Sequence, residues 1–318
     1  MNEKEIKMSD LINEIIKLKK EKNAVILAHN YQIPEIQDIA DFVGDSLGLS
    51  QQAASTKAEL IVFCGVHFMA ETASIISPNK KVIIPDLEAG CSLAASITTE
   101  QLREWKKEFP EAVVVSYINT TAEIKAETDY CVTSSNAVKV VEAIPRDKKI
   151  LFLPDRFLGQ YVSMVSGREM EIWNGACHVH EKIGDIDFAE VQAKHPNAEF
   201  LIHPECGCST SCMLRSRQFP DATNIHIQST EGMINFVKKS DKNEFVIATE
   251  VGILHRLKKI NPSAEIYPLS EKSVCEYMKM ITIEKLYDAL LNEKFEVRVP
   301  EELAAKARIS IERMLAIV

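Results

Sequence analysis

Three cysteines that lie far apart in the chain stand in similar local surroundings. Cys91, Cys177 and Cys275 each follow a short apolar run with the pattern of a strand. Structural zinc normally takes four closely spaced ligands, whereas these cysteines are 86 (91 to 177) and 98 (177 to 275) residues apart. If the fold brings them together, three thiolates are one short of the four that close a [4Fe-4S] site. The remaining iron could then polarise a substrate oxygen as a Lewis acid.

Histidine, carboxylate and hydroxyl side chains follow other apolar runs and could act on a small anion. His203 and Glu205 flank a proline, and the alternation of side chains along a strand would place them on the same side. A general acid–base pair is one interpretation, and a histidine satisfied in the core is the other. Ser46, Ser134 and Thr230 stand in turns that lead into helical patterns. These turns fit ordinary helix capping, and they also fit an anion pocket built from helix N-termini.

A denser group of cysteines is a rival metal signal. Cys206, Cys208 and Cys212 lie within a stretch of seven residues. Such a group could bind zinc, form a redox-sensitive disulfide or supply part of the ligand set of a second cluster. Two other cysteines, Cys64 and Cys131, stand inside strand-like runs and are expected to be buried thiols.

The elements that must position these residues recur three times. Each copy has a strand that ends in a polar anchor, a hydroxyl-bearing turn, a second strand with an amphipathic segment, and a third strand that leads to a cysteine. The anchors and cysteines pair as His29 with Cys91, Asn119 with Cys177, and His203 with Cys275. The intervals are 62 (29 to 91), 58 (119 to 177) and 72 (203 to 275) residues. The longest interval contains the Cys-rich stretch 206–221, which is predicted to be an inserted loop.

This alternation of strands and helices predicts an α/β protein of three similar small α/β/α domains. Their short parallel sheets would be arranged with pseudo-threefold symmetry around a central cluster. The predicted domains are 1–104, 105–187 and 188–279, and helices within 280–318 are expected to pack back on the first. Working residues gather at the carboxyl ends of parallel strands, where each copy places its anchor and its cysteine. A single Rossmann-like domain with appendages is the alternative.

The composition is that of a globular enzyme. The 318 residues are 46% hydrophobic and 26% charged, which is enough for more than one domain. A net charge of -9 argues against nucleic-acid and anionic-membrane partners. No apolar run approaches the roughly 18 residues that span a bilayer, and the start lacks the apolar core of a secretory signal. We therefore expect a cytoplasmic protein whose eight cysteines are not paired in structural disulfides.

Several segments resemble the quinolinate synthase family, over roughly residues 10–315. The most specific are Leu-Ala-His-Asn-Tyr-Gln at 27–32, Asp-Phe-Val-Gly-Asp-Ser-Leu at 41–47, Tyr-Ile-Asn at 117–119, Thr-Ser-Ser-Asn-Ala at 133–137, His-Pro-Glu-Cys at 203–206, Ser-Thr at 229–230 and Cys-Glu-Tyr-Met-Lys at 275–279. The resemblance implies three stacked α/β domains around one [4Fe-4S] cluster, which has three cysteine ligands and one open iron site.

The resemblance also implies roles for individual residues. The cluster ligands would be Cys91, Cys177 and Cys275. Glu205, helped by His203 and Tyr31, would move the protons of the reaction. The implied substrate contacts are His29, Ser46, Tyr117, Asn119, Ser134, His203, Glu205 and Thr230.

The implied reaction condenses iminoaspartate with dihydroxyacetone phosphate to quinolinate, with loss of phosphate and water, in de novo NAD biosynthesis. An L-aspartate-oxidising enzyme would be the partner that supplies iminoaspartate. The cysteine-rich loop is not part of the family's general pattern, so we place it outside the active site. Two other functions fit the motifs: an aconitase-type iron–sulfur hydro-lyase that acts on another small acid, and a non-enzymatic iron–sulfur or zinc sensor.

Overall fold

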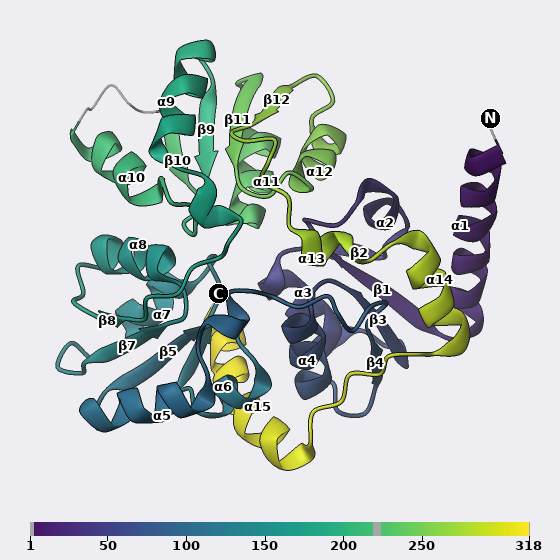
Figure 1. Ribbon diagram of the computed structural model, residues 1–318, viewed down its shortest axis with the longest axis horizontal. Helices are drawn as coiled ribbons and strands as arrows, with labels where there is room; N and C mark the ends of the chain where they lie inside the picture. Colours follow the sequence, from purple (N-terminus) through teal and green to yellow (C-terminus); the bar gives the residue numbers. More distant parts are fainter. Residues whose placement is uncertain (1–2, 219–223, 318) are drawn as a thin grey trace.

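The computed structural model in Figure 1 describes residues 3–218 and 224–317. Within these residues the strands form three four-stranded sheets in which all neighbouring strands are parallel. The strand orders are β2-β1-β3-β4, β6-β5-β7-β8 and β10-β9-β11-β12, so the same order occurs three times. The predicted α/β class with three similar units is therefore confirmed, and the alternative of one Rossmann-like sheet is wrong.

The first unit is built around a sheet whose central strands are buried. Its strands are β1 (Ala24–His29), β2 (Phe42–Gly44), β3 (Leu60–Cys64) and β4 (Lys81–Ile83). Its helices are α1 (Glu3–Glu21), α2 (Pro34–Ile39), α3 (Ser46–Ser55) and α4 (His67–Ile76). Every residue of β3 is buried, which explains why this strand is a continuous apolar run and not an alternating one. Helix α3 begins after Asp45, whose carboxylate accepts the N–H of Gly48 at 2.8 Å.

The second unit repeats this arrangement. Its strands are β5 (Val113–Tyr117), β6 (Tyr130–Val132), β7 (Ile150–Leu153) and β8 (Glu171–Ile172). The 3₁₀ helix η1 (Ala94–Ser96) precedes α5 (Thr99–Glu108), α6 (Ala122–Ala126), α7 (Ala137–Ala143) and α8 (Arg156–Ser166). Thr98 and Gln101 form a capping box at the start of α5. Gly167, with a φ of 62°, ends α8 in the left-handed conformation that glycine adopts readily.

The third unit contains β9 (Glu199–Ile202), β10 (Ile225–Ile227), β11 (Glu244–Ala248) and β12 (Glu265–Pro268). Its helices are η2 (His180–Lys182), α9 (Asp185–Lys194), α10 (Ser209–Gln218), α11 (Thr230–Lys239), α12 (Ile253–Ile260) and α13 (Glu276–Lys279). The predicted inserted loop is wrong for 209–218, because this stretch is helix α10. It joins β9 to β10 as α2 joins β1 to β2, so it is the longer form of a repeated element. Residues 219–221 of the predicted loop lie outside the described residues.

Two helices follow the third unit and return to the others. Helix α14 (Ile283–Asn292) lies against α1, whereas α15 (Glu301–Ala316) lies mainly against α6 and β6 and also contacts α4. The C-terminal segment therefore contacts two of the three units. The domain boundaries at 104/105, 187/188 and 279/280 stay predictions, although each sheet falls inside one predicted domain.

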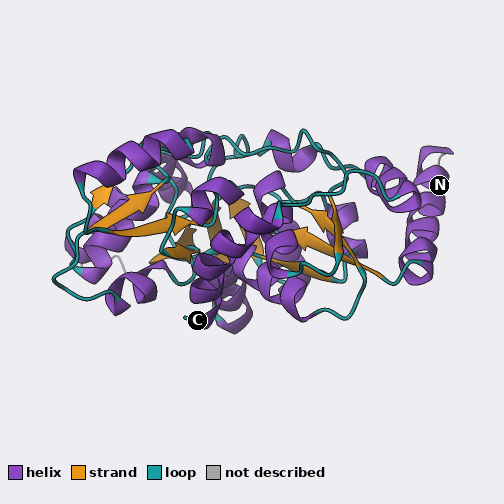
Figure 2. Cartoon of the chain, turned by 90° about the horizontal axis from the view of Figure 1, so that it is seen from below, coloured by secondary structure: helices purple, strands orange, loops and turns teal. Residues whose placement is uncertain are grey.

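The strands run through the middle of the molecule, with helices on both sides of them (Figure 2). The buried side chains of the strands and helices form the core, which includes Cys64 and Cys131 at 0% exposure. These two cysteines are buried thiols, as predicted. In the described part of the chain, no helix has both the length and the apolar character needed to cross a bilayer.

Candidate active site

One cavity lies where the three units meet. His29 ends β1, Tyr117 ends β5 and His203 follows β9, and all three line this cavity. The carboxyl ends of the three central strands therefore converge, as parallel α/β units predict. Every site residue predicted from the sequence lines the cavity: His29, Tyr31, Ser46, Cys91, Tyr117, Asn119, Ser134, Cys177, His203, Glu205, Thr230 and Cys275. Their roles stay predictions.

The three cysteines of this cavity have equivalent backbone surroundings. Cys91, Cys177 and Cys275 follow β4, β8 and β12, which are the last strands of the three units. Cys275 directly precedes α13, whereas Cys91 and Cys177 lie three residues before η1 and η2. In each case the sulfur accepts hydrogen bonds from the backbone N–H groups two and three residues further along. Hydrogen bonds of this kind stabilise thiolates and tune iron–sulfur clusters. The donor set thus fits a cluster that each repeat unit supplies with one ligand.

The thiols also influence one another electrostatically. Burial raises the pKa of Cys91 to about 12, and the neighbouring Cys275 contributes to this rise. Burial is likewise the main cause that raises the pKa of Cys177, followed by the charges of Glu205 and Cys91. Thiols that raise one another's pKa in this way face a common space. A bound metal group would stabilise their thiolates and reverse the shift.

The spacing of these thiols does not fit a single zinc ion. Thiolates bound to one tetrahedral zinc at about 2.3 Å would lie within about 4 Å of one another. In the described part of the chain, one group of histidine, cysteine or acidic side chains has all its ligand atoms within 4.8 Å, and it contains no cysteine. The three cysteines therefore fit a larger group, such as an iron–sulfur cluster.

The rival cysteines do not line the cavity. Cys206, Cys208 and Cys212 are at most 2% exposed and pack with apolar side chains of the third unit. The thiol of Cys206 donates a hydrogen bond to the backbone carbonyl of Ala248 at 3.1 Å. The ligand atoms of these three cysteines do not gather within 4.8 Å in the part of the chain that the structure describes. Their surroundings are those of core thiols, and they do not form a zinc clip.

His203 and Glu205 are in contact at the floor of the cavity. Nδ1 of His203 lies 3.1 Å from Oε2 of Glu205, and the side chain of Tyr117 hydrogen-bonds to the same carboxylate. Nε2 of His203 lies 3.2 Å from Oγ of Ser134. Strand β9 ends at Ile202, so the pair meets in a turn. The predicted proximity is confirmed, but alternation along a strand is not its cause.

Two residues that sequence reasoning missed complete this group. His180 places Nε2 3.0 Å from Oγ1 of Thr249, and the hydroxyl of Tyr31 lies 2.5 Å from the same Thr249 oxygen. Nδ1 of His180 lies 3.8 Å from Oε2 of Glu205. His180, His203 and Glu205 are the group whose ligand atoms lie within 4.8 Å. His180 follows Cys177 by only three residues in the sequence, which is a weak signal that could have drawn attention to it.

Burial and neighbouring groups set the protonation of these side chains. Burial alone would raise the pKa of Glu205, but its electrostatic interaction with His180 and the hydrogen bond from His203 lower it overall. Burial lowers the pKa of His29 to about 3 and that of His180 to about 4. Burial, with a smaller contribution from Glu205, raises the pKa of Tyr31. At neutral pH the site therefore combines the carboxylate of Glu205 with the neutral imidazoles of His29 and His180 and the protonated phenol of Tyr31.

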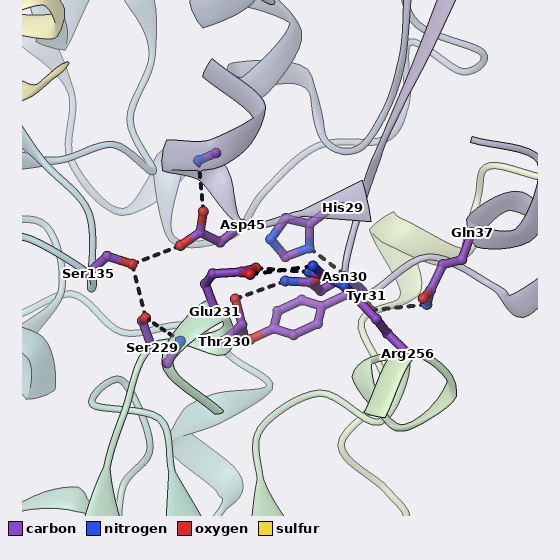
Figure 3. A network of polar contacts seen from close by, with 12 residues as sticks. His29, Asn30, Tyr31, Gln37, Asp45, Ser135, Ser229, Thr230, Glu231 and Arg256 are labelled. Carbon is purple, nitrogen blue, oxygen red and sulfur yellow. Dashed lines mark hydrogen bonds and ion pairs between the residues drawn. The ribbon is translucent and has the colours of Figure 1, made fainter. Parts of the chain in front are cut away.

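The starts of three helices touch one another beside the cavity (Figure 3). Oγ of Ser135, just before α7, lies 2.8 Å from Oδ2 of Asp45 and 2.9 Å from Oγ of Ser229. Asp45 caps α3, and Ser229 caps α11 by accepting the N–H of Gly232. One residue from each unit thus enters a single hydrogen-bonded group. The adjoining hydroxyls of Ser46, Ser134 and Thr230 line the cavity.

An ion pair with a buried carboxylate lies beside the third cysteine. Glu250 is 0% exposed, and its Oε1 lies 2.9 Å from Nζ of Lys279 and 3.2 Å from the backbone nitrogen of Cys275. Lys279 also donates to the backbone carbonyl of Tyr31 in the first unit. The segment that carries Cys275 is therefore held to the first and the third unit at once.

Comparisons with known proteins agree with this geometry. A family model described as quinolinate synthetase A protein matches residues 13–316. A quinolinate synthase of Thermus thermophilus is 54% identical over 307 residues, which cover 96% of this chain and 97% of that protein. The quinolinate synthase of Pyrobaculum aerophilum is 53% identical over 304 residues, and these cover 96% and 98%. That of Mycobacterium tuberculosis is 50% identical over 307 residues, which cover 96% and 88%. The chain therefore belongs to the quinolinate synthase family, the iron–sulfur enzymes of NAD biosynthesis, and is a quinolinate synthase itself.

Proposed function

We propose that Cys91, Cys177 and Cys275 hold one [4Fe-4S] cluster, beside which iminoaspartate and dihydroxyacetone phosphate condense to quinolinate with loss of phosphate and water. The equivalence of the three sulfurs, each with two backbone N–H donors at one cavity, carries this proposal. When bound, a cluster with three protein ligands supplies an open iron that polarises a substrate oxygen as a Lewis acid. An L-aspartate-oxidising enzyme would supply the iminoaspartate.

The hydroxyls at the three helix starts hold the anionic groups of the substrates. Ser46 and Thr230 are the first residues of α3 and α11, where backbone N–H groups are free and the helix dipole favours negative charge. Ser134 adds a third hydroxyl from the second unit. The side chains of His29, Tyr117 and Asn119 complete the cavity wall and contact the substrates. Hydrogen-bond donors from all three units thus face the anionic groups of the substrates.

Glu205 is the base of the reaction. Its lowered pKa leaves a carboxylate at neutral pH, and only 3% of the residue is exposed. His203 holds the carboxylate in position through Nδ1. Tyr31, whose pKa is raised, keeps its proton and can donate it, and Thr249 and His180 connect it to the Glu205 side of the cavity. Proton transfer by positioned groups of this kind contributes about 10²–10⁴-fold to a rate.

Alanine replacements of single cysteines test the cluster assignment. Cys91→Ala, Cys177→Ala and Cys275→Ala should each abolish the brown chromophore of anaerobically purified protein and the formation of quinolinate. Cys206→Ala is the matched control, because this cysteine is buried but does not line the cavity. It should retain both properties. A chromophore that survives the first three replacements but not the fourth would overturn the ligand assignment.

A further inference from the structure

Asn30 of the first unit contacts both the hydroxyl of Thr230 and an ion pair of the third unit (Figure 3). Asn30 follows β1 in the first unit, whereas Thr230 and Arg256 belong to α11 and α12 of the third. Nδ2 of Asn30 lies 3.1 Å from Oγ1 of Thr230, and Nη1 of Arg256 lies 2.8 Å from Oδ1 of Asn30. Arg256 is itself held by Glu231, with Nη1 2.9 Å from Oε2.

The chemistry of these groups determines the direction of every hydrogen bond. A guanidinium has donors only, so the atom of Asn30 that faces Arg256 must be the amide oxygen. The NH₂ group of Asn30 then faces Thr230, and an amide NH₂ can only donate. Oγ1 of Thr230 therefore accepts this bond, and its own hydrogen must point elsewhere. Within the described residues the Thr230 side chain has no other hydrogen-bond partner, and Thr230 lines the cavity.

The arrangement is rigid at Asn30. Its side chain is 0% exposed, and its backbone carbonyl accepts a hydrogen bond from Nε2 of Gln37 at 3.2 Å. Gln37 also donates to the carbonyl of Gly252, at the start of α12, at 2.9 Å. The first unit is therefore hydrogen-bonded both to Thr230 and to the helix that carries Arg256.

We propose that Asn30 and Arg256 are positioning residues that make the Thr230 hydroxyl an obligate donor to the anionic group of the phosphorylated substrate. The inference rests on the proposed function, in which Thr230 contacts that substrate. It adds that the donor is oriented only while the first and third units are docked, because Asn30 and Thr230 come from different units. A hydroxyl hydrogen held in this direction favours an acceptor that carries negative charge. The Thr230 hydroxyl therefore selects for an anionic group of the substrate.

Asn30→Asp is the discriminating variant. The new carboxylate has the shape of the amide and can still accept from Arg256, but it offers an acceptor to Thr230. The hydroxyl of Thr230 then turns its hydrogen to residue 30 and away from the substrate. We expect the KM for dihydroxyacetone phosphate to rise at least tenfold, with a much smaller change in kcat and in the KM for iminoaspartate.

A double-mutant comparison separates orientation from charge. In a Thr230→Val background, Asn30→Asp should raise the KM no further, because there is no hydroxyl to misdirect. Arg256→Gln, which releases the amide of Asn30, should give a smaller rise that also vanishes in that background. The matched control is Lys259→Ala, which removes an exposed ion pair with Asp38 (2.7 Å) between α12 and α2. It should leave the KM unchanged.

The outcomes distinguish the possible errors. An unchanged KM in Asn30→Asp and Arg256→Gln would overturn the inference, as would a rise that persists beside Thr230→Val, since the effect would then be that of charge. An unchanged KM in Thr230→Val alone would instead show that Thr230 does not contact this substrate, and the proposed function would lose that residue. If Asn30→Asp does not retain the chromophore of the folded enzyme, the pair Arg256→Gln and Thr230→Val decides the question.

Discussion

Two buried histidines should make this protein unstable in mild acid. His29 and His180 are 7% and 4% exposed, and burial lowers their pKa values to about 3 and about 4 from an ordinary value of 6.5. The unfolded chain therefore binds protons that the folded protein excludes as the pH falls below 6.5. Their neutral form favours folding fully above pH 6.5, and this contribution to stability is lost progressively as the pH falls towards 3–4.

The size of the effect follows from linkage. One pKa unit corresponds to about 1.4 kcal/mol, so at pH 5 each histidine lowers the free energy of unfolding by roughly 2 kcal/mol relative to pH 7.5. We expect His29→Gln and His180→Gln each to reduce the loss of unfolding free energy between pH 7.5 and pH 5 by about this amount. This reduction should not depend on how each replacement changes the stability at pH 7.5. The assay is urea unfolding of the reduced, cluster-free protein between pH 7.5 and 5. For each variant, the slope of the free energy of unfolding against pH is compared with that of the parent protein.

His67→Gln is the control, because this histidine has 40% of its side chain exposed. The slopes of His29→Gln and His180→Gln should depart from the parent slope further than that of this variant. If His29→Gln and His180→Gln keep the parent slope, both imidazoles accept protons in the folded state. That result would refute the assignment of neutral histidines in the cavity.

Three further changes test the site and the unit boundary. Glu205→Gln should lower kcat for quinolinate formation by at least about 100-fold with the chromophore intact, because the base is lost. A near-normal kcat would contradict the role of Glu205. Gly252→Ala should lower stability by about 1–3 kcal/mol in urea, because its Cβ would lie 2.7 Å from the Tyr31 carbonyl oxygen; unchanged stability would mean that the two units separate easily here. Glu250→Gln should make the chromophore disappear faster under a chelator, because it loses the 2.9 Å ion pair with Lys279 beside Cys275; an unaltered rate would show that this ion pair does not hold Cys275.

The alternatives left open by the motifs are decided by different observations. Membership of the quinolinate synthase family excludes the hydro-lyase and the sensor. The burial of Cys206, Cys208 and Cys212 among apolar side chains excludes them from the cavity, although they are the densest cysteine motif in the sequence. The local density of cysteines did not indicate the site here, because their burial depends on tertiary packing in the third unit and not on their spacing.

The sequence by itself determined the class of fold and the position of the predicted site. Parallel strands that are buried on both faces must be short apolar runs, and their carboxyl ends must meet, so the threefold pattern was sufficient to place His29, Asn119 and His203 with the three cysteines. The helical form of 209–218 was missed because its polar composition has no clear amphipathic period. Sequence reasoning also gave no reason to associate His180 with Thr249 and Tyr31.

Only the tertiary structure decided which side chains complete the site. Asn30 and Arg256 are 226 positions apart, and Ser135 joins Asp45 to Ser229 across intervals of 90 and 94. No local pattern encodes such contacts, because they depend on how three separately folded units dock. The same docking removes water from His180 and His29 and so lowers their pKa values. It also brings His180 and His203 to Glu205, whose pKa they lower against the effect of burial. Residue types and spacing determined what chemistry was available, and the docking of the units determined the protonation states in which it operates.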